Sequence, residues 1–373
     1  MRAPRALGLC LLLLAAKAGA DGSNAQRELG VASHQGSRRT VDTRDGSGRH
    51  APDGAAHQEV KPDTQPSHTD RWLGFATNQG SDTVSVLDLK TQKTVATIPV
   101  GQDPAGVAIA RDGRRAFITT PTGHAVSVID TRTLLEEARL PMPGEVLGIA
   151  ADPARDRVYV NDWYGQRVLV IDTKTLRQIH TAATGKVPAG LAVSHTLELL
   201  VVACRDDNTL CLHRLPSLDR VATIAVGRAP FGVTLDAAGT RAYVANVQSD
   251  SVSVVDLAKR RVLAEIAVGD SPYATALDES RQRLVVTNQQ AGSLSVIDLR
   301  SMKTERTISV AEYPEGIAYS PALDQYFVAS WFENLMLVFA GRDLTQVASL
   351  ACGDGPRAFG DFILPPVPRA IPP

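Results

Sequence analysis

"DTVSVLDLKTQKTVATIPVG", residues 82–101, alternates apolar and polar residues on both sides of a polar turn, which is typical of two β-strands joined by a hairpin. Close copies begin further along the chain: "HAVSVIDTRTLLEEARLPMPG" at His124, "DSVSVVDLAKRRVLAEIAVG" at Asp250 and "GSLSVIDLRSMKTERTISVA" at Gly292. A persistent internal repeat decides the fold before any single motif is weighed, because the repeated units pack against one another.

The repeat has a constant spacing. The aspartate that ends its most regular strand recurs in steps of 42 residues, with one register skipped, at Asp88, Asp130, Asp172, Asp256 and Asp298. In the skipped register the position is Arg214, and in the last register it is Ala340, but the apolar alternation persists around both. The chain therefore contains seven copies without insertion or deletion.

Each copy contains four candidate strands. Around Asp256 these are "PFGVTLD", "RAYVAN", "SVSVVDL" and "RVLAEIAVG". Four short strands in about 40 residues are typical of a β-propeller blade. The sequence therefore predicts an all-β, seven-bladed β-propeller with four antiparallel strands per blade. "LLEEARL" at 134–140 favours a helix locally, but its register predicts a fourth strand.

The two ends of the repeat region are complementary. The N-terminal unit begins at Trp72–Asn78 with a second strand, and the C-terminal segment Arg357–Ile363 supplies a first strand without a blade of its own. Pairing these two segments completes the seventh blade and removes the exposed sheet edges. We therefore expect a closed ring over residues 71–363.

The flanking segments have different compositions. Arg2 and Arg5, an apolar stretch at 7–16 and "AGA" at 18–20 are typical of a signal peptide cleaved near Ala20, which predicts a periplasmic or secreted protein without a membrane span. Residues 21–70 contain no Phe, Trp, Tyr, Ile or Met and predict a disordered linker. Residues 364–373 are half proline and predict a stiff tail.

Charge and motifs exclude several function classes. Without residues 1–20 the chain has 36 basic and 40 acidic residues, a net charge of −4, which argues against nucleic acid as a partner. The chain has no CxxCH, GxSxG or HExxH motif. The histidines of the propeller region occupy different registers of the repeat. We therefore expect no metal site, no cofactor and no catalytic residue of a known motif.

Two repeated features are assigned to the scaffold. The aspartate series suits turns between third and fourth strands, and the G-x-x-P-x-G loops, such as Gly101–Gly106, connect strand to strand rather than strand to helix.

The unit "PFGVTLDAAGTRAYVANVQSDSVSVVDLAKRRVLAEIAVG" resembles the YVTN family of β-propeller repeats, with "YVAN" at 243–246 and "VVTN" at 285–288 in place of the name-giving motif. The resemblance spans about 72–363 and implies an exported bacterial or archaeal seven-bladed propeller.

Two cysteines are candidates for a disulfide. Cys204 ends a second strand and Cys211 lies in the adjacent third strand. A hairpin centred between Asp207 and Asn208 would place them directly opposite one another, within disulfide range. An oxidising compartment would favour the bond, whereas two buried thiols are the alternative.

The candidate site lies where the blades differ. The residue between Pro and Gly in each loop that enters a first strand forms a ring at one channel mouth. The seven residues at this position, which we call the ring residues, are Ala105, Leu147, Ala189, Phe231, Tyr273, Glu315 and Arg357. Tyr313, Trp163, Tyr164 and Trp331 lie in neighbouring loops. Aromatic and charged residues at such a mouth are typical anchors for a ligand, although they can also fill loops.

The sequence thus predicts an exported, monomeric, non-enzymatic propeller that binds a partner protein or a small polar ligand at the ring. Glu315 and Arg357 are expected to form an ion pair beside Tyr273 and Phe231. A propeller enzyme of the lactonase or lyase type, and an accessory subunit of a periplasmic dehydrogenase system, remain alternatives.

Overall fold

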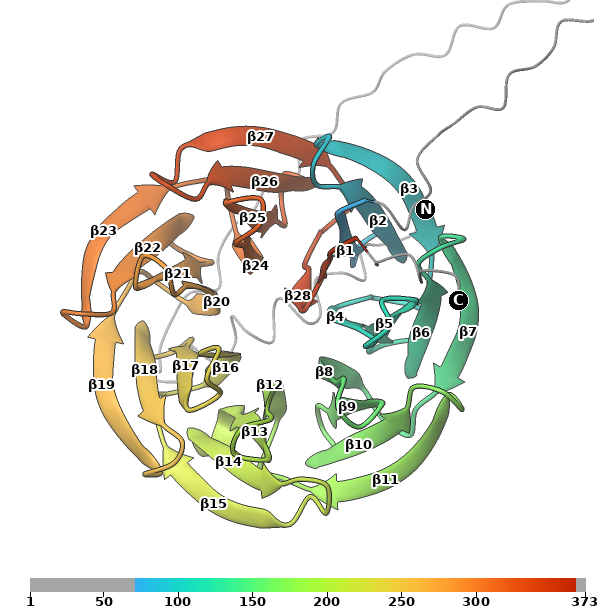
Figure 1. Cartoon of the computed structure of the whole chain (residues 1–373), viewed down its shortest axis with the longest axis horizontal. Helices are drawn as coiled ribbons and strands as arrows, with labels where there is room; N and C mark the ends of the chain where they lie inside the picture. Colours follow the sequence, from blue (N-terminus) through green and yellow to red (C-terminus); the bar gives the residue numbers. More distant parts are fainter. Residues whose placement is uncertain (1–70, 367–373) are drawn as a thin grey trace, which may run out of the picture. The chain divides into compact units, whose positions relative to one another are not determined.

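The computed structural model describes residues 71–366, which form seven β-sheets around a central axis (Figure 1). The predicted fold class is confirmed: the sheets are antiparallel blades of four strands, arranged in a closed ring. The second strands of successive blades, and likewise the third strands, begin 42 residues apart in the sequence, as the repeat predicts. Within the described residues, no helix is long and apolar enough to span a membrane.

The strands follow one another from the axis to the rim in six of the seven blades. Blade 1 contains β1 (Leu73–Asn78), β2 (Thr83–Asp88), β3 (Lys93–Pro99) and β29 (Ile363–Leu364). Blade 2 contains β4 (Gly106–Ile109), β5 (Arg115–Thr120), β6 (Ala125–Asp130) and β7 (Leu135–Pro141), with β28 (Phe359–Gly360) beside β4. Blade 3 contains β8 (Val146–Asp152), β9 (Arg157–Asp162), β10 (Arg167–Asp172) and β11 (Arg177–Ala183), and blade 4 contains β12 (Pro188–Ser194), β13 (Leu199–Cys204), β14 (Thr209–Arg214) and β15 (Arg220–Ala225).

The remaining three blades keep the same order. Blade 5 contains β16 (Pro230–Leu235), β17 (Arg241–Asn246), β18 (Ser251–Asp256) and β19 (Arg261–Ala267); blade 6 contains β20 (Pro272–Asp278), β21 (Arg283–Asn288), β22 (Ser293–Asp298) and β23 (Lys303–Ser309); blade 7 contains β24 (Pro314–Ser320), β25 (Gln325–Ser330), β26 (Leu335–Ala340) and β27 (Gln346–Ala351). The segment with local helix propensity is strand β7, because its outer-strand pairing with β6 determines its conformation.

The core lies between neighbouring blades. Second- and third-strand residues alternate between the two faces of each sheet, and the cluster between blades 2 and 3 joins Phe117 and Val128 to Val160 and Leu169. Burying one such side chain stabilises the fold by about 1.5–3 kcal/mol. The aspartates at the third-strand ends accept hydrogen bonds from backbone N–H groups two or three residues ahead, as at Asp130. Their assignment to turns is confirmed.

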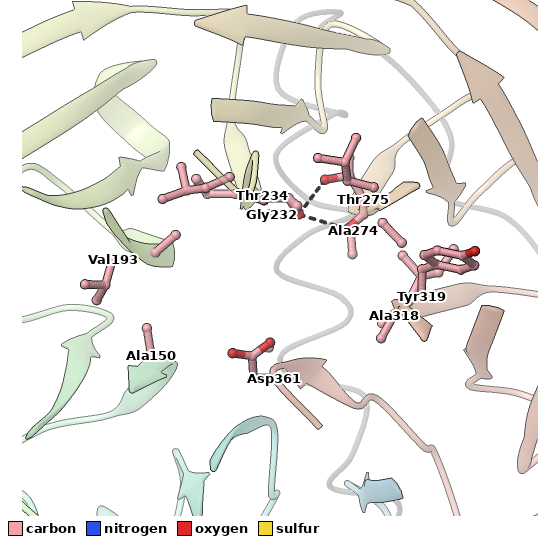
Figure 2. Close-up of a pocket in the computed structure, with 18 of the residues that line it drawn as sticks. Ala150, Val193, Gly232, Thr234, Ala274, Thr275, Ala318, Tyr319 and Asp361 are labelled. Atoms are coloured by element: carbon pink, nitrogen blue, oxygen red, sulfur yellow. Dashed lines mark hydrogen bonds between the residues drawn. The ribbon is translucent and has the colours of Figure 1, made fainter. Parts of the chain in front are cut away.

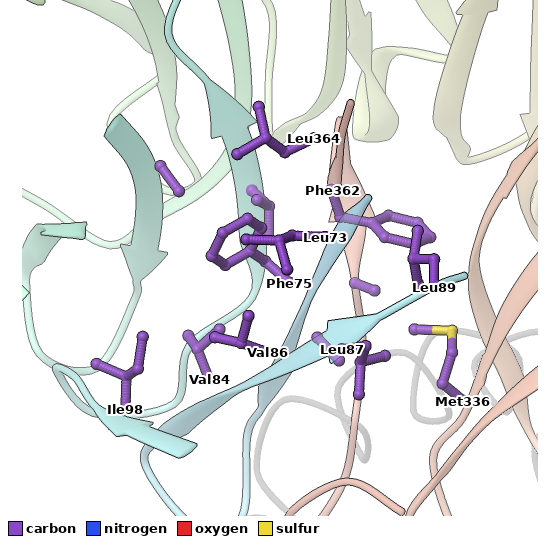
Figure 3. Packing of buried hydrophobic residues seen from close by; sticks show 14 of the residues in the cluster. Leu73, Phe75, Val84, Val86, Leu87, Leu89, Ile98, Met336, Phe362 and Leu364 are labelled. Carbon is purple, nitrogen blue, oxygen red and sulfur yellow. The ribbon is translucent and has the colours of Figure 1, made fainter. Parts of the chain in front are cut away.

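The ring closes in blade 1, as expected, but the closing segment is irregular. Ile363 and Leu364 pair with β1, and the Phe75 N–H donates to the Phe362 carbonyl at 3.0 Å. Between Arg357 and Phe362 the segment leaves blade 1, so that β28 pairs in parallel with β4 of blade 2. Figure 3 shows Phe362 and Leu364 packed against the apolar side chains of β1 and β2. The C-terminal segment therefore bridges two blades.

The predicted register of the cysteine pair is wrong. Cys204 pairs with Thr209 and Cys211 with Val202, so the two cysteines occupy diagonal positions. The hairpin is centred between Asp206 and Asp207, one residue earlier than expected, and this is the register of the equivalent hairpin in the other blades, such as Asn246 with Ser251 in blade 5. Both side chains lie on the same face, are buried, and are thiols with their Sγ atoms 2.9 Å apart. The disulfide stays a prediction.

Candidate functional site

A bulge at the start of the first strand sets the position of each ring residue. In blade 5 the ladder pairs Pro230 with Asn246 and resumes at Val233 with Val244, which leaves Phe231 and Gly232 out of register. The same shift recurs in blades 3, 4, 6 and 7. A Cβ added at Gly232 would lie 2.5 Å from the Tyr273 carbonyl oxygen of the next blade. Glycine is therefore needed there because of close approach between blades.

The ring residues close their end of the channel. Each of the seven side chains is at most 2% exposed. Their contacts run across the axis: the Phe231 ring lies 4.4 Å from that of Tyr273 and 5.2 Å from that of Phe359, centroid to centroid. Trp163 packs edge-on against Phe231 at 6.0 Å and is 8% exposed. The ring residues themselves do not form an open binding surface, because these aromatic side chains pack against one another instead of facing solvent.

The ring residues and the aromatic side chains packed on them close the channel, and we call this group the plug. Glu315 and Arg357 form the predicted ion pair, but the pair lies within the plug rather than on its surface. Glu315 Oε2 lies 3.2 Å from Arg357 Nε, with both side chains at most 1% exposed. Gln289 Nε2 donates to Glu315 Oε1 at 3.0 Å. Burial raises the pKa of Glu315 to about 7, although Arg357 and Gln289 both favour the ionised form. This pair is a buried structural contact that no ligand touches without displacing the plug.

The loops outside the plug retain some exposed aromatic surface. Tyr164 is 53% exposed and Phe332 57% exposed. The Phe332 ring lies 4.7 Å from that of Trp331 and 5.4 Å from that of Tyr313, so these three side chains form one cluster. Of the aromatic candidates, Tyr164, Tyr313 and Trp331 therefore remain accessible in whole or in part, whereas Phe231, Tyr273 and Trp163 do not.

The cavity of the channel lies on the other side of the plug. Its volume is about 750 Å³, and its walls are mainly the first strands of blades 3–7, with Ile109 of blade 2 and Gly360 and Asp361 of the closing segment. It extends to the turns between first and second strands, where His195, Ala237 and Glu279 are exposed. Most of the wall is aliphatic, with Ile149, Leu191, Val193, Val233, Leu235, Leu277 and Ile317 among its residues. The channel is thus closed at the end that the ring residues occupy and open at the opposite end.

Asp361 projects into this cavity (Figure 2). It follows Gly360, whose φ of +101° is accessible to glycine but not to other residues without strain, and it lies where the closing segment returns from blade 2 to blade 1. The Asp361 carboxylate has no hydrogen-bond or ion-pair partner among the described residues. The side chain is open to the channel, yet protein surrounds it, and this loss of bulk water raises its pKa.

The other acidic side chains of the wall, Asp278 and Glu279, accept hydrogen bonds from donors of the protein. Asp278 accepts from Arg281 Nη1 at 2.8 Å and from Arg283 Nη2 at 3.2 Å. Glu279 accepts from the Ala237 N–H at 2.6 Å. Among residues 71–366, no Lys or Arg side chain lines the wall. Asp361 is therefore the one carboxylate of the wall without a protein donor in the part of the chain that the structure describes.

Sequence reasoning missed Asp361, although the repeat carries a signal for it. Its 42-residue register contains Ile109, Ala151, Val193, Leu235, Leu277 and Tyr319, so Asp361 is its single charged residue. Charged and aromatic residues also gather in the entry-loop register, at Glu315 and Arg357, but there they are buried. Within residues 71–366, no group of three or more His, Cys, Asp or Glu side chains is placed to hold a metal ion.

The fold and the cavity together define a seven-bladed β-propeller with a channel open at one end. Its fold is similar to that of a functionally unknown protein from Desulfotomaculum acetoxidans DSM 771, with a TM-score of 0.68 and 15% identity over 78% of this chain and 99% of that one. It is also similar to hydrazine synthase from Kuenenia stuttgartiensis, with a TM-score of 0.67 and 18% identity over 79% and 100% of the two chains.

A further similar structure is the dihydro-heme d1 dehydrogenase NirN in complex with DHE, with a TM-score of 0.62 and 14% identity over 80% of this chain and 76% of that one. At these identities the likeness shows the fold alone. No protein-family model matches this chain, and no curated protein sequence matches it.

Proposed function

We propose that this protein is a binding propeller that holds a small molecule in its central channel. The observation that carries the proposal is the cavity of about 750 Å³, which has an aliphatic wall and one uncompensated carboxylate. Pockets of 300–1,000 Å³ with apolar walls and few polar groups are typical of small-molecule sites. The plug of ring residues supports the same function, because a channel closed at one end retains a ligand.

We further propose that the chain is an exported member of the YVTN type, cleaved near Ala20 and active in the periplasm or outside the cell. The support is the N-terminal sequence and the repeat; residues 1–70 and 367–373 lie outside the described part of the chain. We also propose that a partner protein binds the cluster of Tyr313, Trp331 and Phe332, since exposed aromatic clusters are common interface anchors. Both statements are independent of the cavity.

An enzyme is the second candidate. A carboxylate with a raised pKa in an apolar cavity is suited to proton transfer, and Asp361 is such a group. A lactonase or lyase activity would therefore centre on Asp361 rather than on the ring. Turnover of a lactone or a lyase substrate that Asp361→Asn abolishes would favour this candidate over a binding protein.

Ligand binding in the channel is testable with a neutral apolar probe, N-phenyl-1-naphthylamine, whose fluorescence rises in apolar surroundings. Ala150 faces the cavity, so Ala150→Phe should lower the affinity for the probe at least tenfold. The matched control is Val262→Phe on outer strand β19, where the side chain is 36% exposed. Unchanged affinity in a correctly folded Ala150→Phe variant would show that the cavity is not the site.

A further inference from the structure

We propose that the channel ligand is an organic cation with a single positive charge and an apolar body, bound through its charged group to Asp361. The inference rests on the proposed function, because it names the chemical class of ligand that the cavity accepts. It follows from three features of the wall: its charge, its hydrogen-bonding groups and its apolar area.

The charge of the wall favours a cation. In the part of the wall that the structure describes, the acidic side chains are Asp278, Glu279 and Asp361, His195 is the one imidazole, and there is no Lys or Arg. Asp278 is neutralised by two arginines, whereas Asp361 has no counter-ion among the described residues. Asp361 is open to the channel, so a ligand that fills the cavity would displace water from its carboxylate; that loss is unfavourable without a partner, and a cationic ligand offsets the cost. An anionic ligand would add to it.

The hydroxyl groups of the wall point to the same class of ligand. Thr234 Oγ1 donates to the Thr275 carbonyl at 2.9 Å, and Thr275 Oγ1 donates to Thr234 Oγ1 at 2.8 Å. Ser280 Oγ donates to Asp278 Oδ1 at 2.6 Å, and the Tyr319 hydroxyl donates to Asp324 Oδ1 at 2.8 Å. These are all the Ser, Thr and Tyr side chains that the described residues contribute to the wall.

Each of these hydroxyl protons is thus already used within the protein. The wall side chains offer acceptors to a ligand, while His195 at the open end is their one remaining donor, 3.6 Å from Asp152. A ligand that enters the cavity must therefore supply its own N–H donors. A protonated amine or a guanidinium does so, and its charge strengthens the hydrogen bond to a carboxylate.

The remaining wall limits the ligand to one charge. Around Asp361 the blades present aliphatic side chains, such as Val193 and Ile149, to the cavity. A second charged group on the ligand would lie against this apolar surface without a partner, at a cost of several kcal/mol. A hydrocarbon body instead gains from burial, at about 25 cal/mol per Å² of apolar surface. A monocationic amine fits better than a polyamine.

The test uses three probes with the same apolar body: 4-phenylbutylammonium, 4-phenylbutanol and 4-phenylbutyrate. Each is titrated calorimetrically into the full-length protein, into Asp361→Asn and into Ala150→Phe. Asp361 makes no contact that holds the fold, so Asp361→Asn should melt at or above the temperature of the unmodified protein. Circular dichroism verifies that both variants are folded.

We expect the ammonium probe to bind the unmodified protein at least tenfold more tightly than the alcohol, and the carboxylate to bind more weakly than either. Asp361→Asn should remove the preference for the ammonium probe while leaving the alcohol unchanged, and Ala150→Phe should weaken both. Equal binding of alcohol and ammonium, or a preference that persists in Asp361→Asn, overturns the inference but leaves the proposed binding function intact. Failure of all three probes to bind overturns both.

Discussion

Glu315→Gln should change how the stability of the propeller depends on pH. The carboxyl group of Glu315 has a pKa of about 7 in the folded protein against 4.5 when exposed, because burial disfavours its ionised form. The folded protein therefore binds a proton that the unfolded chain releases between these values. The stabilisation is complete below pH 4.5 and is lost as the pH rises through 7.

The size of the effect follows from the two pKa values. Between pH 5 and pH 8 the contribution of Glu315 to the free energy of unfolding should fall by about 2–3 kcal/mol. For a domain of about 300 residues this corresponds to about 4 °C in melting temperature. Glutamine keeps an acceptor for Gln289 and does not titrate, so the variant should lack this loss.

Urea unfolding of both proteins at pH 5 and pH 8 measures the difference directly. Groups such as Asp361 and His213 also change with pH, but they are present in both proteins and cancel in the comparison. Glu312→Gln, at an exposed position three residues earlier, is the matched control and should retain the full loss. If unmodified protein and Glu315→Gln lose the same free energy, Glu315 is ionised throughout the range, and the argument from burial is wrong.

Three further outcomes are expected. Tyr273→Ala should destabilise the fold by about 3–5 kcal/mol in chemical denaturation, since the ring is 1% exposed within the plug; a loss below 1 kcal/mol would contradict that packing. Truncation before Gly353 should give aggregated protein in size-exclusion chromatography, because β28 and β29 are lost; a monomer with an unaltered melt would refute the closure. Protein from an oxidising compartment should show a Cys204–Cys211 disulfide in non-reducing peptide mapping, and alkylation of both thiols would exclude it.

The fold was predictable because one spacing is repeated without error. A constant step of 42 residues fixes which strands pair, and it places "LLEEARL" in an outer strand despite its helix propensity. The complementary strands at the two ends then require closure. The irregular path of the closing segment was not predictable from periodicity, because it depends on backbone conformations that the repeat does not specify, such as the positive φ of Ala358 and Gly360.

The burial of the ring residues was not predictable from the sequence, for a physical reason. The repeat register shows that Phe231, Tyr273, Glu315 and Arg357 share one level, but it does not show how much space that level offers. In the structure the bulges bring these side chains together with Phe359, and they fill the axis. Large side chains in one ring were therefore a signal of closure rather than of recognition.

The segment that closes the ring also carries the carboxylate of the cavity. Asp361 lies between β28, which pairs with blade 2, and β29, which pairs with blade 1. A molecule bound to Asp361 and to the walls of blades 3–7 would link this segment to the far side of the propeller. Occupancy would then slow local opening of the last strand, so that amide hydrogen exchange at Ile363 and Leu364 becomes a reporter of ligand binding.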